Sequence, residues 1–420
     1  MYPCIALQMR SEERPSMEST FRMTSFNELP ISPALQQRLA QNQFHTPTPI
    51  QSAAIPHALA GKDLMATAQT GTGKTLAFVV PILERLLQAP RSRMVDALVL
   101  VPTRELAMQV HEQFEKLRGK GILPAALIIG GLPERRQLQA LHSGARVLVA
   151  TPGRLEDFLG RKLVDLRHVQ VLVLDEADRM LDMGFLPAIR RIVSMLPRTR
   201  QSMCFSATLE ASVAGLVHDY LREPVRIALG STLKPAASVE LHAYEVPQQE
   251  KFDALCHLLR SVSGQTLVFA RTKRGTERLA RQLVRDGFSA AMIHGDRTQG
   301  QRTGALNGFE QGQYKVLVAT DVASRGIDVR DVAHVVNYDL PTLAEDFIHR
   351  VGRTGRNGAT GLASTLVSPA EALELRSMER TLKLRLERKE IRNHIALARN
   401  SRQNTLASRT LQRLPGEVFA

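Results

Sequence analysis

The sequence of 420 residues has little of what secreted and membrane-spanning proteins usually carry. Its three cysteines, Cys4, Cys204 and Cys256, are too few and too scattered for a disulfide framework or a zinc site. No apolar run approaches the roughly 20 residues that cross a bilayer, and the first residues show no signal-peptide pattern. We therefore expect a cytoplasmic protein without a membrane partner, in which residues 1–22 form a disordered extension.

Aromatic residues are also scarce, with no Trp and a total of 5%. No basic–aromatic interleaving indicates a platform on which nucleic-acid bases would stack. Positive charge, by contrast, is abundant: 55 Lys and Arg stand against 41 Asp and Glu, a net charge of +14. Such a balance favours a polyanionic partner, most often nucleic acid, although it could serve solubility alone. Together these features favour binding to a nucleic-acid backbone rather than to bases.

Short apolar runs alternate with longer amphipathic stretches, which is typical of βαβ units with a parallel sheet. The first half predicts strands near 63–68, 97–102, 125–129, 146–151, 169–175 and 202–206, with helices between them such as 73–88 and 104–117. The pattern lapses in a polar, Pro-containing stretch and resumes with strands near 266–270, 290–294, 315–320, 334–339 and 361–368. We predict two α/β domains, residues 23–227 and 241–385, joined by a linker over 228–240.

The last segment, residues 386–420, loses the apolar pattern but keeps its positive charge. Arg388, Lys389, Arg392 and further arginines are opposed there by few acidic residues. We expect a mostly disordered basic tail that tethers nucleic acid, with a solvated tail of no role as the alternative.

The stretch DLMATAQTGTGKTLAF predicts a phosphate-binding loop. The predicted strand ends at Ala68, and a loop of small residues follows it. This loop leads into a helix whose backbone N–H groups can surround a polyphosphate. Lys74 can reach the β- and γ-phosphates, and the Thr75 hydroxyl can bind Mg²⁺. Ala68 stands where the general pattern has Gly, a mild departure, and an ordinary strand-to-helix turn is the alternative. The residues predicted to bind nucleotide here are Ala68, Gln69, Thr70, Gly71, Thr72, Gly73, Lys74 and Thr75.

The stretch VQVLVLDEADRM, residues 169–180, places three carboxylates at the end of a run typical of a strand buried on both faces. Asp175, Glu176 and Asp178 would repel one another unless a cation lies nearby. A hydrated Mg²⁺ held by the phosphate loop supplies that cation, and Asp175 is placed to bind it. Glu176 is the candidate to orient and deprotonate the attacking water. Without the loop, a helix cap or a solvated turn would be the usual interpretation.

The two segments together resemble the DEAD-box RNA helicases, and the match continues in order over residues 26–368. The resemblance implies two tandem RecA-like domains that use ATP and Mg²⁺ and bind RNA. Phe26 and FHTPTPIQ (44–51) resemble the adenine-recognition segment of the family. Phe44 would then pack against the adenine base, and Gln51 would form hydrogen bonds with the edge of that base. Asp328 would contact the ribose. The bacterial RhlE-like subgroup is the most similar.

Several further segments resemble the RNA-binding motifs of that family and, in the second domain, its interdomain motifs as well. They are PTREL (102–106), Gly130-Gly131 and TPGR (151–154) in the first domain, and VFARTK (268–273), HGDRTQGQR (294–302) and ATDVASRGID (319–328) in the second. Contacts of this kind to phosphates position a strand without reading its sequence. The RNA-binding residues implied are Thr103, Arg104, Gly131, Thr151, Arg154, Gln299, Arg302 and Thr320, although a threonine at such a junction can instead cap a helix.

Two other segments resemble the elements that couple ATP to domain closure. Ser206-Ala207-Thr208 matches the coupling element, and the resemblance links Asp178 to Ser206 and Thr208, with a helix-capping role for Asp178 as the alternative. HRVGRTGR (349–356) resembles the arginine-finger motif. Arg353 and Arg356 can spread positive charge over the γ-phosphate only if the two domains close on ATP.

We therefore expect a monomeric, ATP-dependent RNA helicase that locally unwinds short duplexes or remodels RNA–protein particles. Ribosomal precursors and RNA-decay complexes are the expected partners. The alternatives are an ATP-timed RNA clamp or annealing factor, and a DNA-directed motor of the same superfamily.

Overall fold

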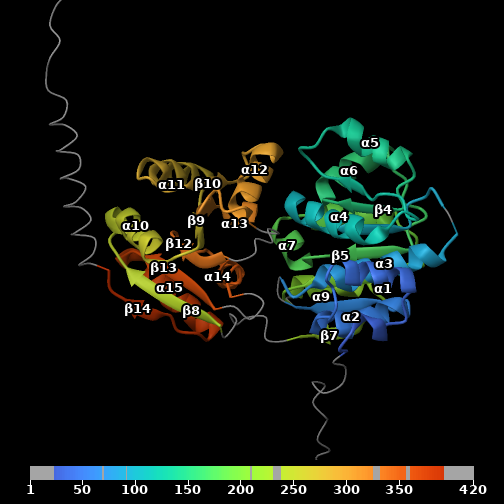
Figure 1. Ribbon diagram of the computed structural model, residues 1–420, viewed down its shortest axis with the longest axis horizontal. Helices are drawn as coiled ribbons and strands as arrows, with labels where there is room; N and C mark the ends of the chain where they lie inside the picture. The colour runs from blue at the N-terminus through green and yellow to red at the C-terminus, as the bar shows by residue number, and fades with distance from the viewer. Residues whose placement is uncertain are drawn as a thin grey trace, which may run out of the picture.

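The computed structural model describes residues 23–68, 71–90, 92–208, 211–229, 238–324, 332–355 and 360–391. Two α/β domains lie side by side, each built on a seven-stranded sheet (Figure 1). All strand pairings among the described residues are parallel. The predicted fold class is therefore confirmed.

The first sheet has the strand order β3-β4-β2-β5-β6-β1-β7. Its strands are β1 (Leu64–Thr67), β2 (Ala97–Leu100), β3 (Ala126–Ile128), β4 (Val147–Ala150), β5 (Val171–Leu174), β6 (Gln201–Ser206) and β7 (Val225–Ala228). The four residues of β5, VLVL, are all buried, as expected for a central strand covered on both faces. Because the strands are parallel, the loops that follow β1, β5 and β6 meet at one edge, where α/β sheets bind their ligands.

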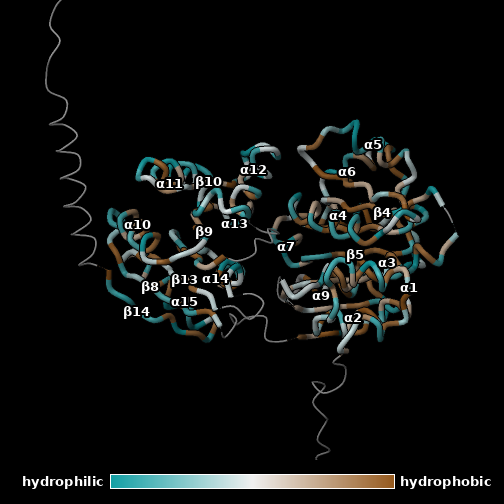
Figure 2. Tube along the Cα trace, in the orientation of Figure 1, coloured by the Kyte–Doolittle hydropathy of each residue, from teal (hydrophilic) through white to brown (hydrophobic). Residues whose placement is uncertain are grey.

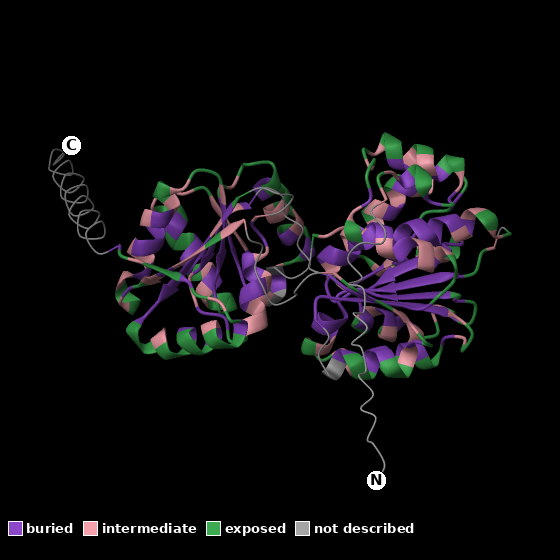
Figure 3. Ribbon diagram, turned by 90° about the horizontal axis from the view of Figure 1, so that it is seen from below, coloured by how far each residue is buried: buried purple, intermediate pink, exposed green. Residues whose placement is uncertain are grey.

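Helices cover both faces of this sheet, and in Figure 3 the strands lie buried between them. One apolar core packs the sheet against the helices that run from α1 to α4, and the other packs it against those from α5 to α9. The helices are α1 (Pro33–Gln41), α2 (Pro49–Leu59), α3 (Lys74–Gln88), α4 (Arg104–Arg118), α5 (Glu134–His142), α6 (Pro152–Gly160), α7 (Ala177–Asp182), α8 (Leu186–Ser194) and α9 (Ala211–Tyr220), preceded by the short helix η2 (Phe26–Glu28).

The second sheet has the order β10-β11-β9-β12-β13-β8-β14. Its strands are β8 (Val239–Glu245), β9 (Gln265–Phe269), β10 (Ala290–Ile293), β11 (Val316–Ala319), β12 (Val332–Asn337), β13 (Gly361–Val367) and β14 (Glu387–Lys389). Its helices are α10 (Lys251–Ser261), α11 (Lys273–Arg285), α12 (Gln299–Glu310), α13 (Asp321–Ser324), α14 (Ala344–Val351) and α15 (Ala372–Leu382), with the short helices η3 (Gln248–Glu250) and η4 (Pro369–Glu371). Hydrophobic segments again coincide with the central strands (Figure 2).

The structure bears on three stretches expected to lie outside the domains. The first sheet ends at Ala228 and the second begins at Val239, on either side of the predicted linker. β14 pairs with β8, so the second sheet extends into the stretch predicted as a tail. Residues 1–22 and 392–420 lie outside the described residues, and the exact domain boundaries stay a prediction. Within the described ranges, no helix is both long enough and apolar enough to cross a membrane.

Candidate nucleotide and RNA site

The phosphate loop, residues 68–75, joins β1 to α3 and is held by a residue of α2. Gly73 has φ +91°, in the left-handed region that favours glycine. Gln51 donates from Nε2 to the Gly73 carbonyl oxygen over 2.9 Å, while its Oε1 accepts from the Thr48 N–H over 2.9 Å. A Cβ at position 73 would lie only 2.4 Å from Gln51 Nε2. The residue expected to bond adenine therefore also fixes the end of the loop.

Lys74 begins α3 with its side chain buried, and its Nζ donates to the Ala68 carbonyl oxygen over 3.0 Å. The ammonium group is thus folded across the loop, and Thr75 follows it in the first turn. Gln69 and Thr70 lie outside the described residues. Within the loop, the arrangement is a strand, a turn with left-handed glycines and a helix N-terminus, as the motif predicts.

Asp175 follows β5 at the same edge and is almost completely buried. One of its oxygens accepts from the Glu176 N–H over 3.0 Å. Burial raises the pKa of Asp175 to about 6, and the positive charge of Lys74 only partly opposes this. A buried carboxylate with so little compensation is suited to a cation brought by the substrate.

Glu176 has a left-handed backbone, with φ +51°, which is uncommon for a residue with a side chain. Its Oε2 accepts from Arg179 Nη1 over 2.9 Å, and both side chains are buried. Arg179 Nη2 is buried without a hydrogen-bond partner in the described part of the chain. The carboxylate expected to orient water is therefore held by an arginine one helical turn away.

Asp178 is bonded to the segment that follows β6. Its Oδ2 accepts from the backbone N–H groups of Ala207 and Thr208 over 2.8 and 2.9 Å, and from the Thr208 hydroxyl over 3.4 Å. The Thr208 N–H also lies 3.3 Å from Ser206 Oγ. The structure thus brings together the three residues expected to couple ATP to closure.

Some of the residues expected to contact the nucleotide outside the phosphate loop lie within the described residues, and others do not. Phe26 is buried in the first core, where its N–H donates to the His45 carbonyl oxygen over 3.3 Å, and Phe44 packs against the same core. Asp328 and Arg356 lie outside the described residues. Arg353 is buried after α14 and donates from Nε to the His349 carbonyl oxygen over 3.3 Å.

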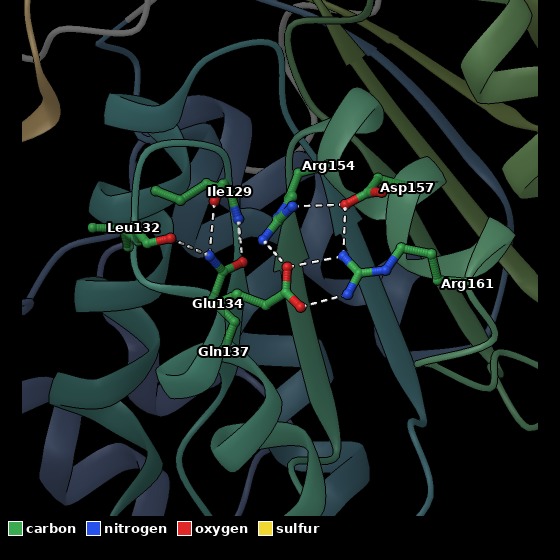
Figure 4. Close-up of polar contacts among 7 residues, drawn as sticks. All are labelled: Ile129, Leu132, Glu134, Gln137, Arg154, Asp157 and Arg161. Atoms are coloured by element: carbon green, nitrogen blue, oxygen red, sulfur yellow. Dashed lines mark hydrogen bonds and ion pairs between the residues drawn. The ribbon is translucent and has the colours of Figure 1, made fainter.

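The expected RNA-binding residues of the first domain gather at the loops after β2, β3 and β4. Arg104 lies against the Gly130-Gly131 turn, because a Cβ at Gly131 would be 2.5 Å from Arg104 Nη1. Gln137 of α5 pins this turn: it exchanges hydrogen bonds with the N–H and carbonyl of Ile129 over 3.1 and 3.0 Å and donates to the Leu132 carbonyl oxygen over 3.0 Å (Figure 4). Gly131 has φ +82°, in the left-handed region that favours glycine.

Arg154, in the first turn of α6, is bound by carboxylates on two helices. Its Nη2 donates to Glu134 over 2.9 Å and its Nη1 to Asp157 over 2.6 Å (Figure 4). Its guanidinium also lies 4.4 Å above the centre of the Phe158 ring. The side chain is therefore oriented before any RNA arrives.

The three threonines expected at RNA differ in their local roles. Thr103 caps α4, since its Oγ1 accepts from the Leu106 N–H over 3.3 Å. Thr151 precedes α6 without a side-chain capping bond, and Thr320 is buried after β11. The capping alternative therefore describes Thr103.

Of the three residues expected at RNA in the second domain, Gln299 and Arg302 contact the first domain. Gln299 Nε2 donates to Glu105 Oε1 over 3.0 Å, and Arg302 Nη2 donates to Glu105 Oε2 over 2.7 Å. All three side chains are buried, and burial lowers the pKa of Arg302. In Figure 1, α12 accordingly faces the first domain. Their contact with RNA stays a prediction.

Four residues of the site were not singled out from the sequence: Glu105, Glu134, Gln137 and Arg179. Glu105 and Arg179 lie within the quoted motifs, but their partners depend on packing. Glu134 and Gln137 are three residues apart on α5, the spacing that places two side chains on one face of a helix. This spacing, so close to the Gly130-Gly131 turn, is the sequence feature from which Glu134 and Gln137 could have been identified.

The oxygen ligands of the predicted metal site suit Mg²⁺. Thr75 follows β1 and Asp175 follows β5, so both lie at the same edge of the sheet, with β6 between the two strands. Among the described residues, no group of three or more His, Cys, Asp or Glu could hold a metal alone. Magnesium sites at nucleotides commonly use one or two carboxylates together with substrate phosphates.

A parallel sheet with a phosphate loop, an acidic strand end opposite it and a second similar domain defines a P-loop nucleotidase with two RecA-like domains. Comparison with known families agrees. Residues 48–216 match the DEAD/DEAH box helicase model, and residues 250–358 match the helicase conserved C-terminal domain. The DEAD-box ATP-dependent RNA helicase CshA of Bacillus cereus is 41% identical over 367 residues, covering 87% of this chain and 70% of CshA. The chain therefore belongs to the DEAD-box RNA helicase family.

Solved structures show the same relationship. The Saccharomyces cerevisiae Dbp5 structure bound to RNA and ADP BeF3 has a TM-score of 0.80 and 31% identity, covering 88% of this chain and 96% of that one. The structure of a DEAD box protein from Methanococcus jannaschii is 38% identical, with a TM-score of 0.52. The match covers 87% of this chain and 99% of that one. The resemblance to the RhlE-like subgroup stays a prediction.

Proposed function

We propose that this chain is an RNA-stimulated ATPase that uses ATP to separate short RNA duplexes without reading their sequence. The observation that carries this proposal is the Glu105 bridge, through which α12 contacts α4 beside the expected RNA-binding residues. The similarity to an RNA-bound structure across both domains supports it.

In the proposed cycle, the phosphate loop binds ATP while Lys74 moves from the Ala68 carbonyl oxygen to the β- and γ-phosphates. Thr75 and Asp175 would hold Mg²⁺, which would supply positive charge to the phosphates. Glu176 orients the attacking water, and Arg353 and Arg356 approach the γ-phosphate when the domains close. Asp178 transmits the state of this site through its bonds to residues 207 and 208.

RNA contributes to the same closure. Arg104, Arg154 and the Gly130-Gly131 turn bind its phosphates on the first domain, and Gln299, Arg302 and Thr320 approach from the second. The closed state must favour a single strand by more than the roughly 1–2 kcal/mol of stacking lost at each disrupted step. Hydrolysis then releases the domains. We also propose that the protein works as a cytoplasmic monomer on ribosomal precursors or RNA-decay complexes.

Whether RNA or DNA is the partner can be tested by measuring the ATPase rate of the full chain with RNA and with DNA of matched sequence. We expect RNA to stimulate hydrolysis more strongly than DNA. Stimulation by DNA that equals or exceeds that by RNA would overturn the proposal in favour of a DNA-directed motor.

A further inference from the structure

Glu134, the first residue of α5, lies between two arginines that come from the two ends of α6. Its Oε2 accepts from Arg154 Nη2 over 2.9 Å and from Arg161 Nη1 over 2.8 Å, and its Oε1 accepts from Arg161 Nη2 over 2.5 Å (Figure 4). Phe158 lies beneath both, with its ring centre 4.4 Å from one guanidinium carbon and 5.9 Å from the other. Asp157 Oδ2 also accepts from Arg154 Nη1 over 2.6 Å and from Arg161 Nη1 over 3.5 Å. Two carboxylates thus join the two guanidinium groups, and Glu134 is the one that comes from a different helix.

This arrangement has the chemistry of a phosphate site. Planar guanidinium groups bind the oxygens of carboxylates and phosphates in the same forked geometry, so Glu134 occupies the place of a phosphate. Arg154 Nε is buried without a hydrogen-bond partner in the described part of the chain, so the cluster retains an unused donor. Hydrogen bonding from Arg161 lowers the pKa of Glu134 to about 2, so the carboxylate stays ionised at neutral pH.

The cluster is also open to a ligand. The side chains of Arg161 and Glu134 are 46% and 35% exposed, and exposed ion pairs of this kind contribute little to stability. A phosphate that carries its own negative charge can therefore replace the carboxylate without the loss of a strong internal bond. Released from the arginines, Glu134 can be solvated where it stands.

We propose that Arg154 and Arg161 form a clip for one RNA phosphodiester, and that Glu134 is a built-in counter-ion that RNA displaces. The proposal rests on the proposed function, because RNA is the polyanion concerned. It extends the RNA path beyond TPGR to Arg161, a residue outside the motifs quoted from the sequence. Glu134 then acts as a positioning residue that keeps both arginines oriented in the RNA-free protein.

The test is the affinity of the full chain for a labelled single-stranded RNA, measured by fluorescence anisotropy across salt concentrations with a non-hydrolysable ATP analogue. We expect Arg161→Gln to weaken binding several-fold and to reduce the slope of log K against log salt by about 0.7, as for one phosphate on a single strand. Glu134→Gln should tighten binding several-fold, and that gain should shrink in the double variant with Arg161→Gln.

Asp165 and Arg167 provide matched controls. They form an exposed ion pair, in which Arg167 Nη2 lies 2.8 Å from Asp165 Oδ2. Both residues precede β5, so they lie at the opposite edge of the sheet from the loop that follows β4. Asp165→Asn and Arg167→Gln change the net charge as the test variants do, and we expect both to leave affinity within about two-fold, since an exposed pair contributes little.

Two results would overturn the clip. One is an Arg161→Gln variant whose affinity and salt slope match those of Arg167→Gln. The other is weaker binding by Glu134→Gln, which would make the carboxylate a structural support. Absence of RNA binding by the wild type would overturn the proposed function together with the clip. RNA binding that does not change when Arg161 is substituted would overturn the clip alone.

Discussion

Three carboxylates follow β5 within four residues, and each has a different partner. Asp175 is buried near Lys74, Glu176 is bonded to Arg179, and Asp178 is bonded to the backbone after β6. The sequence predicted roles for Asp175 and Glu176, because an acidic strand end near a phosphate loop needs a cation, whereas the role of Asp178 followed from the family resemblance. It did not predict Arg179, since a charged residue one helical turn from an acid is more often an exposed partner.

At this residue scale, Arg179→Met should lower the free energy of unfolding by about 3–5 kcal/mol, because Glu176 is left buried without its counter-charge. The double variant Arg179→Met with Glu176→Gln should recover much of that loss, since no unpaired charge remains. Urea unfolding of the nucleotide-free protein checks this. Equal losses in the single and double variants would show that packing, rather than charge pairing, holds Arg179.

The raised pKa of Asp175 predicts how stability depends on pH. The folded-state pKa of about 6 lies above the ordinary 3.8, so the folded protein holds the proton more tightly than the unfolded chain. The resulting stabilisation is complete below about pH 4 and is lost as the pH rises through 6. The difference of roughly 2 pKa units corresponds to on the order of 3 kcal/mol.

Asp175→Asn removes this titration, so the nucleotide-free variant should gain stability relative to the wild type as the pH rises from 4 to 7. Unfolding free energies of both proteins across that range give the measurement. A difference between the two that does not change with pH would contradict the assignment.

At the scale of elements, the apolar runs identified most strands correctly but missed β7, β8 and β14. β5 is apolar throughout, because it is buried on both faces. β8 carries Glu240 and His242, and β14 reads ERK. These strands lie at one side of their sheet, where only part of their surface is covered, so the hydrophobic pattern that marks central strands is absent. Pairing between β8 and β14 depends on residues too distant in sequence to be matched by pattern.

The phosphate loop depends on a glycine at one position. Gly73→Ala should weaken ATP binding by at least about ten-fold, because the backbone is left-handed there and the added Cβ would lie 2.4 Å from Gln51 Nε2. Gly215→Ala is the matched control, since this helical glycine has nothing within 4 Å of an added Cβ. It should leave ATP binding unchanged and stabilise α9 by about 0.5–1 kcal/mol. Titration with a fluorescent ATP analogue separates the two, and unchanged binding by Gly73→Ala would contradict this account of the loop.

At the scale of the whole molecule, the contact between the domains could not be predicted from the sequence. Glu105 and Gln299 are 194 residues apart, and both belong to motifs that resemble RNA-binding elements. The motifs predicted a shared ligand, whereas the structure adds a direct bond between the domains. The two α/β folds and the phosphate loop were predicted from local patterns, and the other loops at the sheet edges from the family resemblance.

Glu105→Ala should weaken RNA binding in the presence of an ATP analogue by about ten-fold or more, since it leaves Arg302 buried without its partner. Fluorescence energy transfer between dyes on the two domains should show reduced closure. Glu112→Ala, which breaks the exposed Glu112–Lys116 pair on the same helix, should change neither measurement. Closure by Glu105→Ala equal to that of the wild type would show that the bridge does not hold the domains together.

Strand displacement tests most directly the claim that ATP hydrolysis at the phosphate loop drives duplex separation. The wild type and Lys74→Ala are each mixed with a short labelled RNA duplex and ATP, and release of the strand is followed in time. We predict that the wild type separates the duplex and that Lys74→Ala is slower by about 100-fold or more, because the variant lacks the charge that stabilises the transferred phosphate. Equal displacement by the two proteins would contradict the account.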